Sequence, residues 1–222
     1  MKQTYLRDGG NDRLLLLFSG WGGEPALFDA PSDDGCDCMV CWDYSSLDFD
    51  AAVLARYASV RLLAWSMGVW AAAQTFAGDE SMLDMKIAVG GSETPIDDAC
   101  GIPEAIFRGT LERFSPVTLA KFRHRMCGTA DGVKDFLARH PQRTVEDLHS
   151  ELAAIAGMVA SRPVRRLHWD KSVIGTRDNI FPAANLHRAW KGTPAIEVDA
   201  AHWDAGLFAA LIDGKEGFWT KI

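Results

Sequence analysis

The sequence has little of what secreted and membrane-spanning proteins need. Its first residues, MKQTYLRDGGNDR, lack the apolar core of a signal peptide, and its longest unbroken aliphatic run, LLLLF at 14–18, is far too short to span a bilayer. The five cysteines are an odd number without the spacing of a disulfide framework. We therefore expect a cytoplasmic protein that does not associate with membranes.

The cysteines also give little support for a metal site. Cys36, Cys38 and Cys41 lie close together in CDCMVCW, but Cys38 and Cys41 fall in an apolar segment that reads as a strand. Residues three apart on a strand face opposite sides of the sheet, so buried reduced thiols are favoured over metal ligands. A chain of 222 residues can bury enough surface to fold without a metal or disulfide, and we expect no metal and no cofactor.

Positive charge is scarce overall but is concentrated in one segment. The net charge of −7 argues against nucleic-acid binding. Residues 101–170 nevertheless carry eleven Lys and Arg against eight Asp and Glu, so this segment is cationic within an acidic protein. The segment is either a solvated helical surface or a docking face for an acidic partner, and composition does not separate the two.

Alternating strand and helix patterns predict an α/β fold. Helical patterns at 49–57, 67–76 and 182–190 separate several apolar runs, which is typical of a mostly parallel sheet with helices on both faces. The turn-rich DGGND between the first two strands suggests an opening hairpin. The expected strands, about seven in number, lie at 3–7, 13–18, 38–42, 60–65, 85–91, 172–176 and 195–199.

The alternation stops between about 95 and 163. Four successive helical patterns, at 102–114, 115–126, 131–140 and 144–160, stand there between the fifth and sixth expected strands. We expect one domain over 1–222, in which this insertion forms a cap above the carboxyl ends of the strands. Open α/β sheets bind their ligands at that edge.

Ser66 occupies a tight turn between an expected strand and an expected helix, in VRLLAWSMGVW. A serine at this place can simply cap the helix. It can also be the nucleophile of a strand–turn–helix elbow, in which the positions two before and two after the serine must be small. Ala64 and Gly68 meet that requirement, so both interpretations are open from this stretch alone.

A serine nucleophile needs a histidine base and an acid that orients it. Among six histidines, His202 follows the last expected strand directly, which suits the chain order Ser…Asp/Glu…His of hydrolases with this kind of sheet. Asp178 follows the sixth strand and is the preferred acid over Asp199, which lies only three residues before His202.

The glycine-rich segment after the second strand, FSGWGG, can supply an oxyanion hole. The backbone N–H of Trp21 is the candidate donor there, and the N–H of Met67, just after Ser66, is the second. A phosphate-binding loop is the competing interpretation of the glycines. It is weaker because the chain has neither G-x-G-x-x-G nor a Walker lysine.

Four segments together resemble a known family: FSGWGG, AWSMGVWAA, GGSETPIDDACGIPEAIFRGTL and AAHW. They look like the BioG-type pimeloyl-[acyl-carrier protein] methyl ester esterases of biotin synthesis, which have the α/β-hydrolase fold. The resemblance implies hydrolysis of the methyl ester on a pimeloyl chain held by acyl carrier protein. It implies Ser66 as nucleophile, His202 as general base and acid, and Asp178 as the orienting acid.

The cationic segment suits such a partner, because acyl carrier proteins are strongly acidic. A second basic cluster is Arg165 and Arg166. Two alternatives stay open: a thioesterase or acyltransferase with the same three residues, and a non-catalytic binding protein that kept the fold. The candidate carrier-binding residues are Arg108, Arg113, Lys121, Arg123 and Arg125.

Overall fold

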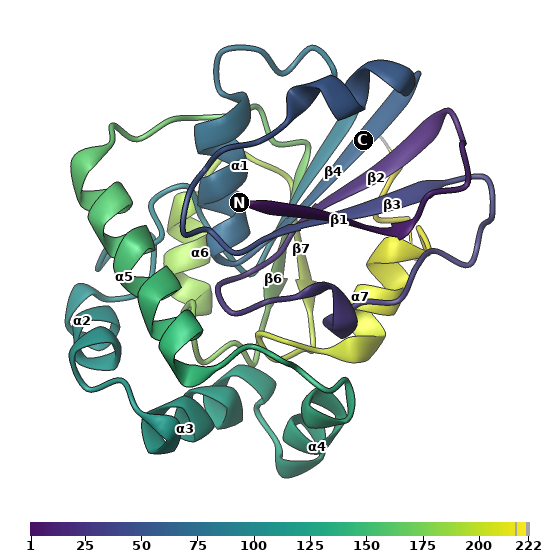
Figure 1. Ribbon diagram of the computed structural model, residues 1–222. Helices are drawn as coiled ribbons and strands as arrows, with labels where there is room; N and C mark the ends of the chain where they lie inside the picture. The colour runs from purple at the N-terminus through teal and green to yellow at the C-terminus, as the bar shows by residue number, and fades with distance from the viewer. Residues whose placement is uncertain (216, 221–222) are drawn as a thin grey trace.

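The structure, a computed structural model, describes residues 1–215 and 217–220 and centres on one seven-stranded sheet (Figure 1). The strand order is β1-β3-β2-β4-β5-β6-β7. Neighbouring strands are parallel, except that β1 is antiparallel to β3. The strands are β1 Lys2–Arg7, β2 Arg13–Phe18, β3 Asp37–Trp42, β4 Ser59–Trp65, β5 Met85–Val89, β6 Lys171–Gly175 and β7 Ala195–Val198.

Helices cover both faces of the sheet. In Figure 1, α1 (Met67–Phe76) and α6 (Ala183–Ala189) lie on one face and α7 (Ala205–Ile212) lies on the other. Two short 3₁₀ helices, η1 (Pro25–Leu27) and η2 (Ala51–Arg56), occur in the connections after β2 and β3. The expected α/β class, with a mostly parallel sheet of about seven strands and helices on both faces, is confirmed.

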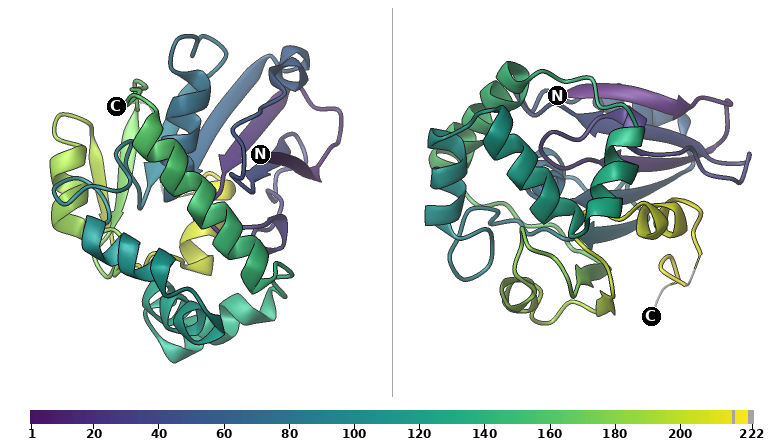
Figure 2. Two further views of the ribbon diagram at one scale, coloured as in Figure 1. Left: turned by 60° about the vertical axis from the view of Figure 1, so that its left-hand side comes forward. Right: turned by 90° about the horizontal axis from the view of Figure 1, so that it is seen from below.

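The four expected helices between β5 and β6 are present. We call them the helical block, and they keep together as one group in both views of Figure 2. Capping boxes explain the sharp starts of the second and fourth of these helices: the Ser115 and Thr144 hydroxyls each accept an N–H of the first turn of the following helix. In the part of the chain that the structure describes, no helix is long and apolar enough to cross a membrane. The helices are α2 Glu104–Glu112, α3 Pro116–Cys127, α4 Ala130–Ala138 and α5 Val145–Ser161.

The inner strands form a core that is covered from both sides. All five residues of β5 and of β6 are buried, as are the last five of β2. Cys38 and Cys41 are completely buried in β3 with free thiols. The expectation of buried free thiols is therefore confirmed for these two, whereas Cys36 is only half-buried.

Three local expectations differ from the structure. The opening hairpin is wrong: β3 lies between β1 and β2, because both edges of β2 pair with parallel neighbours, β3 and β4. The helix expected at 49–57 is only the six-residue 3₁₀ helix η2. The helix α7, after the last strand, was not predicted at all.

Candidate active site

Ser66 sits in a strained turn between β4 and α1. Its backbone has φ of 58°, a left-handed conformation that non-glycine residues rarely adopt. The surrounding chain approaches so closely that only glycine fits. A Cβ atom at position 68 would lie 2.3 Å from the carbonyl oxygen of Phe18, and one at position 91 would lie 2.3 Å from that of Ser66. The strand–turn–helix geometry is that of a nucleophile elbow, and Ser66 makes no side-chain cap for α1.

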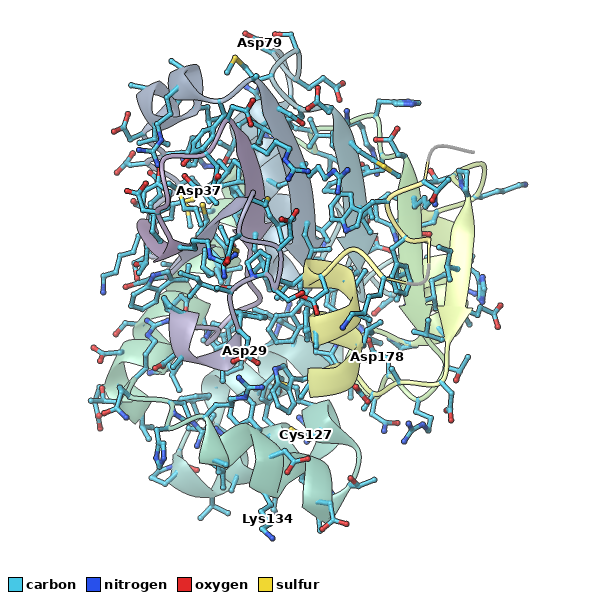
Figure 3. The ribbon with its side chains drawn as sticks, turned by 90° about the vertical axis from the view of Figure 1, so that its right-hand side faces the viewer. Asp29, Asp37, Asp79, Cys127, Lys134 and Asp178 are labelled. Carbon is cyan, nitrogen blue, oxygen red and sulfur yellow. The ribbon has the colours of Figure 1, made fainter. Side chains whose placement is uncertain are left out.

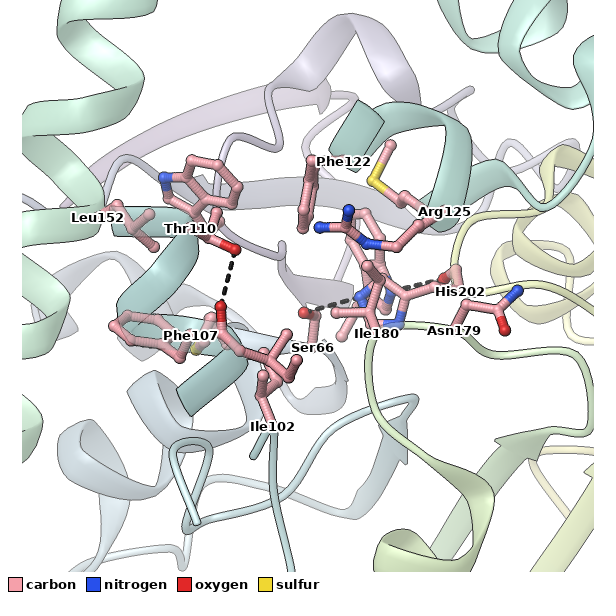
Figure 4. Close-up of a pocket in the computed structure, with 15 residues that line it drawn as sticks. Ser66, Ile102, Phe107, Thr110, Phe122, Arg125, Leu152, Asn179, Ile180 and His202 are labelled. Atoms are coloured by element: carbon pink, nitrogen blue, oxygen red, sulfur yellow. Dashed lines mark hydrogen bonds between the residues drawn. The ribbon is translucent and has the colours of Figure 1, made fainter. Parts of the chain in front are cut away.

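Ser66, His202 and Asp178 form one hydrogen-bonded chain (Figure 4 shows the first two). His202 Nε2 lies 2.9 Å from Ser66 Oγ, and His202 Nδ1 lies 2.7 Å from Asp178 Oδ2. The side chains of His202 and Asp178 are only 2% and 1% exposed. A carboxylate only accepts, so it holds the ring proton on Nδ1 and leaves Nε2 to accept the Ser66 proton.

Backbone groups and aromatic rings fix the acid and the base. Asp178 Oδ1 accepts the N–H groups of Ile180 and Phe181 at 2.7 and 2.9 Å. The ring of Phe181 stacks on the His202 imidazole at 5.8 Å between centroids. The Trp65 indole donates to the His202 carbonyl oxygen at 2.9 Å. These aromatic supports were not identified from the sequence, because their contacts join distant segments.

Asp199, the rival acid, points elsewhere. Its side chain is 82% exposed and accepts a hydrogen bond from Arg177 Nε at 2.6 Å. The carboxylate that contacts His202 is therefore that of Asp178.

The loop at residues 19–23, here called the glycine loop, runs beside Ser66. A Cβ atom at position 20 would lie 3.0 Å from Ser66 Cβ, so the loop passes directly against the elbow. Within residues 1–215 and 217–220, the Trp21 backbone N–H has no hydrogen-bond acceptor. Met67, the other expected donor, is the first residue of α1.

A narrow apolar cavity, here called the inner chamber, lies over Ser66 and His202. Trp21, Trp65 and Met67 contribute to its wall, whereas Trp70 and Trp203 are buried in the core. The helical block supplies much of the rest: Phe107 from α2, Phe122 from α3 and Leu152 from α5.

Arg125 is the one permanently charged side chain among the described residues that line the inner chamber, and Figure 4 shows it directed inward. It also lines a wider depression of about 1070 Å³, here called the outer groove, together with Arg113 and Lys121. No acidic residue of the described chain lines this groove. The chamber and groove share Ile106, Thr110, Arg125, Asn179 and Ile180.

The other candidate carrier-binding residues do not line the outer groove. Arg108 lines two depressions beside Glu104, and the one that also includes Glu112 shares Arg113 with the outer groove. Arg123 lies over the Phe136 ring at 5.5 Å, and burial lowers the pKa of its guanidinium.

The second basic cluster has partners of its own. Arg165 donates to the Ala77 carbonyl oxygen at 2.9 Å, and Arg166 pairs with Glu93 at 2.8 Å. Neither lines the outer groove.

A family model described as "Pimeloyl-ACP methyl esterase BioG" matches residues 1–212. The chain belongs to the BioG family of pimeloyl-ACP methyl esterases. It is thus a carboxylic-ester hydrolase. The crystal structure of BioG from Haemophilus influenzae has a TM-score of 0.85 and 34% identity, covering 94% of this chain and 97% of that one.

Two further relatives extend the comparison. A malonyl-[acyl-carrier protein] O-methyltransferase from Bacteroides fragilis is 43% identical over 192 residues, which are 86% of this chain. The chain spans only 39% of that protein's length. An esterase from Exiguobacterium antarcticum shares the fold, with a TM-score of 0.67, 15% identity and coverage of 97% of this chain and 91% of that one.

Proposed function

We propose that this BioG-family protein hydrolyses the methyl ester of a pimeloyl chain held on acyl carrier protein, with Ser66 as the nucleophile. The observation that carries the proposal is the buried chain of hydrogen bonds from Ser66 through His202 to Asp178, at the floor of the inner chamber. That chamber opens past Arg125 toward a cationic groove, as an ester on an acidic carrier requires.

The reaction proceeds through an acyl-enzyme. Ser66 Oγ attacks the ester carbonyl carbon while His202 Nε2 takes the hydroxyl proton. The resulting oxyanion accepts hydrogen bonds from the backbone N–H groups of Trp21 and Met67. Collapse of the tetrahedral intermediate expels methanol, to which His202 returns the proton. Water, activated by His202, then releases Ser66 and leaves a free carboxylate on the acyl chain.

The charges of the site set the direction in which the substrate enters. The methyl ester and the neutral methylene chain suit the apolar inner chamber, which would disfavour a charged end. The carrier-linked end leaves between Arg125 and Asn179 into the outer groove, where Arg113 and Lys121 attract the acidic carrier. The helical block thereby acts as a cap over the strand ends.

The test is to give methyl-pimeloyl acyl carrier protein to the wild type and to Ser66→Ala, and to follow the carrier by mass. Loss of the methyl group with the wild type alone supports the proposal. Loss of the whole acyl group instead identifies a thioesterase. No reaction by a folded wild type contradicts the proposed activity.

A further inference from the structure

Glu151 is a fully buried carboxylate that the reaction above does not use. It lies on α5 in the helical block, and its side chain is 0% exposed. Carboxylates are almost never fully buried unless they are paired, and replacing a buried ion pair by apolar residues often costs no stability. Stability alone therefore explains poorly why a carboxylate occupies this position.

Both oxygens of Glu151 bind backbone N–H groups of segments near the carboxyl ends of strands. Oε2 accepts the N–H of Gly22, in the glycine loop, at 3.2 Å. Oε1 accepts the N–H of Tyr44, after β3, at 2.8 Å. Arg143 compensates the charge through a direct ion pair. Burial raises the pKa of the Glu151 carboxyl, while Arg143 and the two N–H donors act against that rise.

These contacts immobilise the glycine loop on both sides of the Trp21 N–H. The N–H of Ser19 donates to the Cys41 carbonyl oxygen at 2.9 Å, and the N–H of Gly23 donates to the Gly20 carbonyl oxygen at 2.9 Å. With the Gly22 N–H bound to Glu151, the Trp21 N–H lies next to a fixed group and is free to bind substrate.

The helical block makes a second contact with the same loop. The Trp21 indole donates to the Leu148 carbonyl oxygen of α5 at 2.9 Å. Gly22 has φ of +70°, and a Cβ atom there would lie 3.1 Å from Leu148 Cδ2. One turn of α5 thus holds both the side chain of Trp21 and the backbone of the residue that follows it.

We propose that Glu151 is a positioning residue for ester hydrolysis: it holds the glycine loop so that the Trp21 N–H points at the oxyanion. The inference rests on the proposed function, in which Trp21 supplies that N–H. Oxyanion donors are effective because they are oriented before charge develops, and a misplacement of about 1 Å can cost ~100-fold in rate. Two separate N–H groups need two acceptor oxygens, which explains why a carboxylate serves here.

Glu151→Gln tests the inference, because the amide keeps the shape of the side chain but has only one acceptor oxygen. Its –NH₂ group then faces the N–H of either Gly22 or Tyr44, and in both orientations the repulsion displaces the side chain that holds the glycine loop. We expect kcat to fall on the order of 10-fold with KM unchanged, on the carrier-linked ester and on a small methyl ester alike. Affinity for a trifluoromethyl ketone, which mimics the tetrahedral intermediate, should fall by the same factor.

Asp37→Asn is the matched control. Asp37 is also fully buried, accepts the N–H of Gly9 at 2.8 Å and pairs with Arg56 at 3.3 Å. It lies at the opposite edge of the sheet, far from Asp178 in Figure 3. Both variants should lower Tm, but only Glu151→Gln should lower kcat per active site, counted by labelling with a serine-reactive phosphonate.

An unchanged kcat per active site in Glu151→Gln would overturn the inference while leaving the proposed function intact. If this variant does not fold, Glu151→Asp replaces it. The shorter carboxylate keeps the negative charge that pairs with Arg143 but does not reach Gly22 and Tyr44 together. The same fall in kcat is therefore expected, and its absence again overturns the inference. If the folded wild type has no esterase activity, it is the proposed function that is contradicted, and this outcome is distinct from an unchanged kcat in the variant.

Discussion

The sheet and the helical block meet at the inner chamber and contribute different things to it. The sheet supplies Ser66, Asp178 and His202 from segments just beyond strand ends, where their side chains are joined by hydrogen bonds. The helical block supplies apolar walls, Arg125 and the cations of the outer groove. The proposed function thus assigns the chemistry common to all esters to the sheet and the choice among esters to the helices. Glu151 is the exception, because it belongs to the helices and contacts a loop of the sheet.

Removal of the nucleophile should have the largest effect. Ser66→Ala is expected to lower kcat by about 10⁵–10⁶-fold, equally for the carrier-linked ester and a small methyl ester, because no other group forms the acyl-enzyme. Initial rates on both esters, with circular dichroism to verify folding, measure this. Residual activity within 100-fold of the wild type would place the nucleophile elsewhere.

Replacing Asp178 tests the part of the site that the sheet supplies. Asp178→Asn should lower kcat by about 10³–10⁴-fold on both esters, because the amide no longer holds the His202 proton on Nδ1. Asp199→Asn is the control and should stay within about 2-fold, since exposed polar substitutions have small effects. Equal losses from both variants would contradict the role of Asp178.

The outer groove should affect only the carrier-linked ester. Replacing Arg113 and Lys121 together by Ala is expected to lower kcat/KM for that ester on the order of 10-fold, through slower association and with weaker salt dependence. Activity on the small methyl ester should not change. Arg165→Ala, outside the groove, is the control. If the double variant has a normal kcat/KM for the carrier-linked ester, the outer groove does not bind the carrier.

Modification of the buried cysteine thiols should have the smallest effect on activity, whether the thiol lies on the sheet or on the helical block. Burial raises the pKa of Cys38, on the sheet, and of Cys127, on the helical block, to about 12 each. At pH 8 only about 1 in 10⁴ of such thiols is ionised, and the thiolate is the reactive form. Iodoacetamide should therefore leave these two thiols unmodified, whereas a phosphonate abolishes activity. Rapid loss of activity with alkylation of either thiol would show that it is accessible.

The sequence predicted the sheet side of the site better than the helical side, for a physical reason. Parallel topology brings strand ends to one edge, so the turns holding Ser66, Asp178 and His202 could be placed from their position after apolar runs. A helix buries one face, and small differences in rotation decide where its cations point. Arg108 lies in the middle of α2 and Arg113 caps its end, and of the two only Arg113 lines the outer groove.

Local sequence patterns do not predict contacts between residues that are far apart in the chain. Glu151 and Gly22 are 129 residues apart in the chain, and no periodicity links them. The hairpin expected from DGGND failed for the same reason, since its local turn signal competes with the pairing of β2 to β3 and β4. The glycine at position 22, which needs a positive φ, was the one visible sign that this loop is tightly held.

The position of the helical block has a consequence for biogenesis. The growing chain presents β5 while residues 90–170 are still being made, and β6 can pair with it only afterwards. At ~5–20 residues per second, the apolar edge of β5 waits several seconds for its neighbour, long enough for aggregation. The four helices of the block form local contacts during this interval. These helices can therefore form before β6 completes the sheet.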